Sequence, residues 1–261
     1  MNQVFTEATS PDFGRCIFCP RFDTVLPLGP YNASSPSNFR SPIAQLVEKN
    51  QLDENVFSLR LSRGITDTEG QLVLGGVVDE DLYEGTFTTI PVTDEIPDLP
   101  DIPRKLTDCN EENWKVHASS LTLGNGSDIK HDFDSPTIAA LDTAYPWIAI
   151  PRDLAQSLNG IMDAEIWGPF AWVECSRRSQ FENVTIVLEG QEFMLSPFDY
   201  ILEQEYEDEP GRLYCQSAFV PAFWEGSGMV LLGSAFLRAF VTVWDLEGRT
   251  VSCKSDSQKP S

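Results

Sequence analysis

The chain has 261 residues, enough for one large domain or two ordinary ones, with 40 acidic against 18 basic residues. A formal charge of −22 repels phosphate backbones and anionic lipids, which argues against nucleic-acid and membrane-surface functions. Eighteen Pro and 17 Gly predict many turns and few long helices, and no apolar run has the length of a transmembrane helix.

The first part of the chain predicts one short helix and several strands. Residues 22–29 are an apolar run that ends in Pro-Leu-Gly, which predicts a strand followed by a turn. Ser41 is a predicted N-cap, and Pro42 is the first residue of a helix over 42–50. Three later segments alternate with period two and are predicted strands: 56–61, 70–75 and 85–92.

An acidic, proline-rich segment over residues 94–112 is predicted to be a linker or insertion. It divides the chain into a first part, residues 1–93, and a second part, residues 113–261. Acidic residues also gather between Glu203 and Glu209, where we expect a solvated loop.

The second part predicts mainly β-structure. A strand is expected over 114–123 and a short helix over about 152–159. Further strands are expected at 170–175, 184–189, 191–195, 214–220, 229–232, 241–245 and 249–253. Glu189-Gly190 is the predicted turn of a hairpin, and residues 235–240 predict a single helical turn. The predicted fold class is therefore mostly β.

The stretch from Ile138 to Pro151 contains one acidic residue, Asp142, between two apolar runs. A buried carboxylate costs several kcal/mol unless another group pairs with it or shares its proton. We therefore expect Asp142 to be buried and to need a partner, which makes it a candidate for a functional residue. Its structural alternative is an Asp at the end of a strand that caps a turn.

Six cysteines and three N-glycosylation sequons favour the secretory pathway. The sequons begin at Asn32, Asn125 and Asn183. The N-terminus, however, has neither the basic nor the apolar region of a signal peptide. Our hypothesis is that the sequence begins inside a longer product, and we expect an extracellular or secretory-pathway location.

Several short motifs follow one another in a defined order. They include Val25-Leu-Pro-Leu-Gly29, Gly70-Gln-Leu-Val-Leu-Gly75, Ala140-Leu-Asp-Thr-Ala144, Val173-Glu-Cys175 and Met229-Val-Leu-Leu-Gly233. This ordered set resembles the pepsin-like aspartic peptidases over nearly the whole chain. The resemblance implies a fold of two β-barrel lobes, each of which supplies one Asp. The two Asp share a proton and activate a water that attacks a peptide carbonyl.

On this resemblance, the first part of the chain corresponds to the end of the first lobe together with strands between the lobes. The second part corresponds to a complete second lobe. Asp142 takes the place of the second-lobe catalytic Asp, with Thr143 and Ala144 in its turn. The resemblance implies a peptide or protein substrate, no cofactor or metal, and a monomer.

The resemblance also pairs two of the six cysteines, because Cys175 and Cys215 correspond to the usual second-lobe disulfide. The sequence leaves the pairing of the other four open: Cys16, Cys19, Cys109 and Cys253.

Three departures from the family pattern affect the expected activity. The Asp-Thr-Gly of the first lobe is missing, and so is its flap with a Tyr. The second-lobe turn continues with Ala144, Tyr145 and Pro146, where the family has Gly and then hydroxyl residues. Because one carboxylate cannot divide the acid and base roles, we predict that this chain has no peptidase activity as a monomer.

Three functions stay open. The first is a truncated, inactive pepsin-like protein, either a gene-model fragment or a pseudo-enzyme that binds peptides. The second is an active aspartic endopeptidase whose other lobe is encoded upstream or supplied by a second chain, as in retroviral peptidases. The third is a secreted structural or binding β-protein without a peptide cleft. An upstream Asp-Thr-Gly would separate the first two, and peptide binding by Asp142 variants would separate the first from the third.

Overall fold

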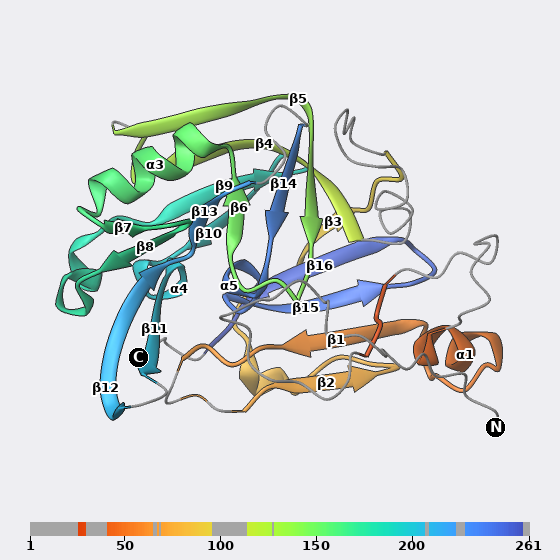
Figure 1. Ribbon diagram of the computed structural model, residues 1–261. Coiled ribbons are helices and arrows are strands. Elements are labelled where there is room, and N and C mark those ends of the chain that lie inside the picture. Colours follow the sequence, from red (N-terminus) through yellow and green to blue (C-terminus); the bar gives the residue numbers. More distant parts are fainter. Residues whose placement is uncertain are drawn as a thin grey trace, which may run out of the picture.

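The computed structural model describes residues 26–29, 41–64, 67, 69–95, 114–126, 128–206, 209–222 and 228–257. Over these ranges the chain is mostly β-structure, which confirms the predicted fold class (Figure 1). None of the helices in these ranges combines the length and apolarity needed to cross a membrane.

The described strands form three sheets. The first has the order β2 (Gln71–Leu74), β1 (Val56–Arg60), β15 (Phe240–Asp245), β16 (Thr250–Ser255) and β3 (Thr88–Pro91). In it, β1 pairs antiparallel with β15, and β3 pairs antiparallel with β16. Strands from early in the chain and from its C-terminal part therefore share one sheet. The predicted boundary at 94–112 lies almost wholly outside the described residues and stays a prediction.

The second sheet positions the Asp142 turn. Its order is β10 (Gln191–Leu195), β9 (Val184–Leu188), β4 (Trp114–Leu123), β5 (Ile129–Leu141), β14 (Met229–Leu232), β6 (Ile148–Ile150) and β13 (Phe219–Pro221). β14 lies between β5 and β6, parallel to β5 and antiparallel to β6 (Figure 1). The loop from β5 to β6 must therefore cross the end of β14.

The third sheet has the order β11 (Ile201–Tyr206), β12 (Glu209–Ser217), β8 (Phe170–Val173) and β7 (Glu165–Trp167). The acidic run from Glu203 was predicted to be a solvated loop, and this prediction was wrong for the residues that lie in β11. Glu203 pairs across the sheet with Cys215 and forms an ion pair with Arg178, so the acidic side chains do not prevent strand pairing.

Helices are short and few in the described ranges: α1 (Pro42–Glu48), α3 (Arg152–Ile161), α4 (Pro197–Tyr200), α5 (Ser234–Leu237), and 3₁₀ turns at Glu80–Leu82 and Cys175–Gln180. The predicted start of α1 is confirmed, because the Ser41 hydroxyl accepts a hydrogen bond from the Ala44 N–H at 3.2 Å. The hairpin between β9 and β10 is also confirmed. Glu189 and Gly190 at its turn both have positive φ, as a tight two-residue hairpin requires.

Two predicted strands differ from the structure. The run 214–220 divides into β12 and β13, because the Ala218 N–H donates to the carbonyl of Tyr200 and the chain then pairs with β6. Within 22–29, only residues 26–29 are described, and they are not a strand. Pro27 has no N–H for a ladder, and the Leu28 carbonyl instead accepts a hydrogen bond from the Trp114 indole at 2.9 Å.

Aromatic side chains join the first two sheets. Phe57 of β1 stacks on Trp244 of β15 with ring centroids 5.7 Å apart, and Trp114 of β4 meets Trp244 edge-on at 5.1 Å. All three are buried in one hydrophobic core that also contains Leu141, the last residue of β5. The strand that leads to Asp142 is thus anchored by apolar packing.

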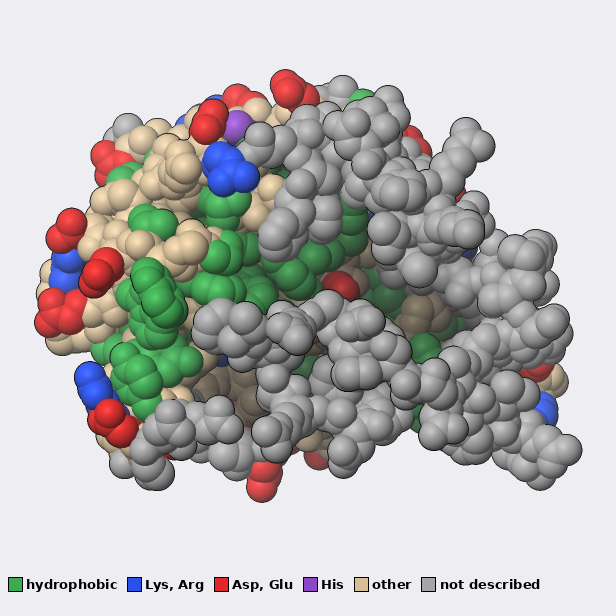
Figure 2. Space-filling model, in the orientation of Figure 1, with side chains coloured by type: hydrophobic (Ala, Val, Ile, Leu, Met, Phe, Trp, Pro, Cys, Tyr) green, Lys and Arg blue, Asp and Glu red, His purple; other side chains and the backbone are tan. Residues whose placement is uncertain are grey.

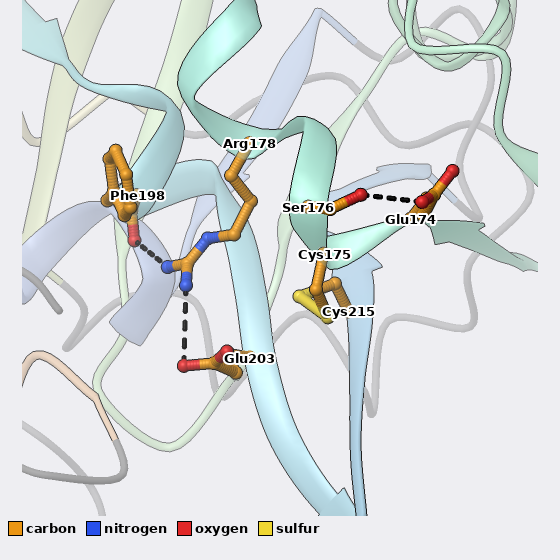
Figure 3. Close-up of a disulfide and its surroundings, with 7 residues drawn as sticks. All are labelled: Glu174, Cys175, Ser176, Arg178, Phe198, Glu203 and Cys215. Atoms are coloured by element: carbon orange, nitrogen blue, oxygen red, sulfur yellow. Dashed lines mark hydrogen bonds and ion pairs between the residues drawn. A yellow bond between two sulfur atoms is a disulfide. The ribbon is translucent and has the colours of Figure 1, made fainter.

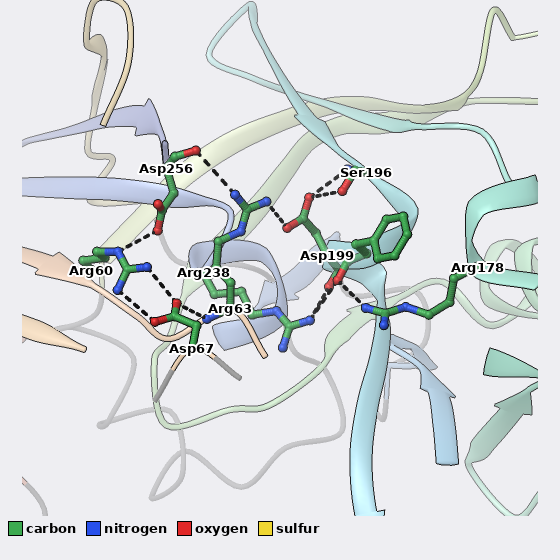
Figure 4. Close-up of polar contacts among 9 residues, drawn as sticks. Arg60, Arg63, Asp67, Arg178, Ser196, Asp199, Arg238 and Asp256 are labelled. Atoms are coloured by element: carbon green, nitrogen blue, oxygen red, sulfur yellow. Dashed lines mark hydrogen bonds and ion pairs between the residues drawn. The ribbon is translucent and has the colours of Figure 1, made fainter. Parts of the chain in front are cut away.

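A buried ionic network lies beside this core (Figure 4). The Arg60 guanidinium bonds Asp67 at 2.7 Å and Asp256 at 2.9 Å, and the Arg63 guanidinium bonds Asp199. Burial alone would raise the pKa of Asp67, but its hydrogen bonds and the charge of Arg60 lower it overall. The network ties the segment after β1 to α4 and to the end of β16.

Candidate active site

Asp142 lies at the end of β5, immediately after the buried Leu141, and it is exposed together with Thr143 and Ala144. The expectation that Asp142 is buried was wrong. The apolar run before it is buried because it forms β5, but the chain leaves the sheet at Leu141, so the carboxylate reaches solvent. The backbone N–H of Asp142 donates to the carbonyl of Leu232 at 3.1 Å, which fixes the turn to the end of β14.

Gly233 holds the next part of this turn in place. Its N–H donates to the Trp147 carbonyl at 3.0 Å, and the N–H of Ser234 donates to the Tyr145 carbonyl at 2.6 Å. A Cβ on residue 233 would lie 2.1 Å from the Tyr145 oxygen. Only glycine therefore allows the loop to cross the end of β14 at this distance.

The Asp142 carboxylate itself caps the turn, since its Oδ1 accepts a hydrogen bond from the Ala144 N–H at 2.8 Å. Among the described residues it makes no other hydrogen bond or ion pair. Ala144 is not among the described non-glycine residues with positive φ, so its methyl group fits the turn without left-handed strain. The geometry of the turn therefore survives the Gly-to-Ala departure from the family pattern.

Aromatic residues continue from the turn along one side of the second sheet. Tyr145 meets Trp147 edge-on at 5.7 Å, and Trp147 lies 5.0 Å from Phe170. Burial raises the pKa of Tyr145 to about 12, so its hydroxyl stays protonated. Hydrophobic side chains also gather in the middle of the face shown in Figure 2, over the region of β5, β6 and β14. We call the series Tyr145, Trp147 and Phe170 the aromatic series.

The turn borders a cavity of about 170 Å³ that brings distant residues together. Leu26–Gly29 and Asp142–Ala144 both line it, together with Phe57, Trp114 and Trp244. Asp142 is the one acidic residue among those that line it. Sequence reasoning did not place Leu26–Gly29 beside Asp142. The signal was present, however, because this run and Val230–Gly233 share an apolar pattern that ends in Gly.

The structure contains the disulfide between Cys175 and Cys215, with Cα atoms 5.2 Å apart (Figure 3). It ties the 3₁₀ turn after β8 to β12, beside the ion pair of Arg178 and Glu203. A carboxylate oxygen of Glu203 lies within 4.8 Å of both sulfur atoms. Bonded sulfurs provide no thiolate, so this group is not a metal site while the disulfide is intact.

The other predicted residues are placed only in part. Asn125 and Asn183 are exposed at neighbouring strand ends, where the Gly124 N–H donates to the Asn183 carbonyl at 2.8 Å. Cys253 is buried and makes no disulfide within the described residues, and burial raises its thiol pKa to about 12. Four predicted residues lie outside the described ranges: Cys16, Cys19, Cys109 and Asn32.

Comparison with known proteins identifies the family. The family model described as "Eukaryotic aspartyl protease" matches residues 1–255. The chain belongs to this family. Vacuolar protease A of Neurospora crassa is 33% identical over 255 residues, which are 96% of this chain and 56% of that protein. Gastricsin of Cavia porcellus is 29% identical and covers 88% of this chain and 52% of its own length.

Cathepsin D of Dictyostelium discoideum is 27% identical over 96% of this chain and 59% of its own length. The chain therefore spans about half the length of the curated relatives that it matches. The resemblance to pepsin-like peptidases and the pepsin-like fold class are both confirmed. The catalytic assignment of Asp142 stays a prediction.

Proposed function

We propose that residues 1–261 form the Asp142 half of an aspartic-peptidase cleft and bind extended peptides there, but do not hydrolyse them unaided. One observation supports this most directly: Asp142 is the single acidic residue that lines its cavity. Aspartic-peptidase chemistry needs two carboxylates that share a proton and hold a water between them. One carboxylate that is hydrogen-bonded to a backbone N–H cannot supply both roles.

Peptide binding is supported by the surface beside Asp142. The aromatic series offers apolar contact, and the Trp147 indole N–H is buried without a hydrogen-bond partner among the described residues. Such a donor favours a ligand that carries a carbonyl group. An extended peptide with apolar side chains matches both features.

An active endopeptidase is the second candidate. Asp142 and Thr143 are exposed, and the turn is held by backbone hydrogen bonds to β14, so a second Asp from other residues could face Asp142. In this reading an Asp-Thr-Gly lobe outside residues 1–261 completes the pair. This candidate is supported by the relatives named vacuolar protease A, gastricsin and cathepsin D, because each of them is longer than the segment that matches this chain.

We also propose that the protein is a monomer of the secretory pathway and carries N-glycans. The disulfide between Cys175 and Cys215 supports an oxidising compartment. The exposed side chains of Asn125 and Asn183 support glycan attachment at their sequons.

The function is tested with the purified polypeptide of residues 1–261. A denatured protein substrate is incubated with it between about pH 3 and pH 6, the range in which carboxylate pairs titrate. We expect no cleavage by the wild type, by Asp142→Asn or by the surface control Asp153→Asn. Cleavage by the wild type and the control that is lost in Asp142→Asn would overturn the proposal.

Peptide binding is measured separately by calorimetry with an extended apolar peptide that carries a transition-state mimic. We expect saturable binding by the wild type and by Asp153→Asn, with weaker binding by Asp142→Asn. Absence of binding by all three proteins would favour the structural β-protein instead.

A further inference from the structure

A second cavity, of about 160 Å³, lies between α3 and the strands of the second sheet, and no part of the proposed function uses it. We call it the α3 cavity. Its floor consists of buried side chains: Leu123, Leu158, Met162, Tyr200 and Phe219. A dry cavity of about this size holds a single aromatic ring.

The hydroxyl of the tyrosine on this floor is not free to bind a ligand. The Tyr200 hydroxyl donates to the Glu182 carbonyl at 2.6 Å. Burial, followed by the charge of Glu182, raises the pKa of Tyr200, so the hydroxyl remains a donor that is already used. A ligand on this floor would therefore make apolar and ring contacts, to which Phe219 and Phe181 also contribute.

The rim has the opposite character, because Asp128, Glu182 and Gln180 all line the cavity. Within the described residues, neither carboxylate forms an ion pair, and no side-chain hydrogen bond engages the Gln180 amide. Arg177 lies 5.4 Å from the centroid of the Phe181 ring, but it forms its ion pair with Asp163 and not with either rim carboxylate. The rim thus presents unneutralised negative charge above an apolar floor.

Gly124 gives the Glu182 carboxylate its place. A Cβ on residue 124 would lie 1.8 Å from Oε2 of Glu182, so the carboxylate occupies space that any other residue would fill. Gly124 also has a φ of +57° and donates its N–H to the Asn183 carbonyl, which holds the two segments together. The backbone therefore positions an acidic group at the mouth of the cavity.

We propose that the α3 cavity binds an aryl-alkyl ammonium ion, with the ring on the apolar floor and the ammonium at Asp128 and Glu182. A primary ammonium has three donors, which suit two carboxylates and the Gln180 amide oxygen. The net charge of −22 favours a cation over an anion of the same shape.

The test is calorimetric titration of the full chain at pH 6 with 2-phenylethylammonium, 2-phenylethanol and phenylacetate. We expect saturable binding of the ammonium ion and at least about tenfold weaker binding of the alcohol and the carboxylate. Equal binding of the three compounds, or no ammonium binding up to about 10 mM, would refute the proposal.

Two variants locate the site. Glu182→Gln should weaken binding of 2-phenylethylammonium by about tenfold, whereas Glu192→Gln, at an exposed position on β10, should leave it unchanged. Ile161→Trp, at the exposed edge of the cavity, should fill it and abolish binding while circular dichroism shows an intact fold. Unchanged binding in both Glu182→Gln and Ile161→Trp would place the ligand elsewhere and overturn the proposal.

Discussion

Gly233 follows β14 and packs against the backbone of the loop that joins β5 to β6. The two oxygens that an added Cβ would meet, on Tyr145 and Trp147, accept backbone hydrogen bonds from residues 234 and 233. Neither carbonyl can move aside without breaking the contact that forms the Asp142 turn. Strain at this position would therefore affect the sheet and the turn together.

We predict that Gly233→Ala lowers the free energy of unfolding by about 3 kcal/mol or more. The matched control is Gly160→Ala in α3, where nothing lies within 4 Å of the added Cβ. The control should raise stability by about 0.5–1 kcal/mol, because alanine favours a helix more than glycine does. Urea denaturation measures the free energy of unfolding of both variants. Equal stability of the two variants would contradict the conclusion that only glycine fits against the Tyr145 and Trp147 carbonyls.

Predictions for single residues succeeded where the cause was local. The N-cap at Ser41 depends on a side chain and a backbone group three residues apart, so the sequence alone reveals it. The burial of Asp142 was predicted wrongly because the apolar residues on both sides suggested continuous burial. The end of β5 at Leu141 is set by β14, a strand about 90 residues later, and no local pattern encodes that pairing.

Secondary-structure elements were likewise predictable where their cause was local and not where it was a distant pairing. The β9–β10 hairpin was predictable because its turn chemistry and its pairing are both local. The full length of β5 was not predicted, since its first half is mostly polar and three of its side chains, Lys130, Asp132 and Asp134, are exposed. The position of β14 between β5 and β6 could not be predicted from the sequence either, because this strand order depends on strands far apart in the chain.

His117 connects three elements through its ring. Nδ1 lies 2.7 Å from Glu189 in the β9–β10 turn, and Nε2 lies 3.4 Å from Glu95, which follows β3. Burial alone would lower the pKa of His117, but the hydrogen bonds and charges of Glu189 and Glu95 outweigh it and raise the pKa. The charged form of His117 therefore stabilises the fold.

Because the folded pKa of His117 is raised, its contribution is fully present below the unfolded value of about 6.5. The contribution is lost as pH rises through the folded pKa. We predict that His117→Gln is less stable than the wild type at about pH 5.5 and that the difference shrinks above that folded pKa. Thermal unfolding at several pH values measures this difference in stability, with His131→Gln as the control. A difference that grows with pH would contradict the assignment.

The whole molecule depends on contacts between segments distant in sequence. The ionic network joins Arg63, after β1, to Asp199 in α4, and both side chains are buried. The sequence showed these charges but not their pairing, since 136 residues separate them. Removing one member leaves the other charged and buried, which costs far more than losing a surface pair.

We predict that Arg63→Met lowers the free energy of unfolding by about 3–5 kcal/mol. The control is Arg212→Met, which breaks the exposed pair with Glu209 and should change the free energy of unfolding far less. Chemical denaturation of both variants measures the difference. Similar small losses in both would show that the buried pair contributes no more than a surface pair.

The insertion of β14 also sets the order of events during biosynthesis. Ser234 donates its side-chain hydroxyl to the carbonyl of Pro146, 88 residues earlier in the chain. At about 5–20 residues per second, a ribosome needs about 4–18 s to synthesise the residues between them. Throughout that interval the nascent chain already contains Asp142 but lacks the strand that shapes its turn. A binding surface beside Asp142 can therefore form only after Ser234 has been synthesised.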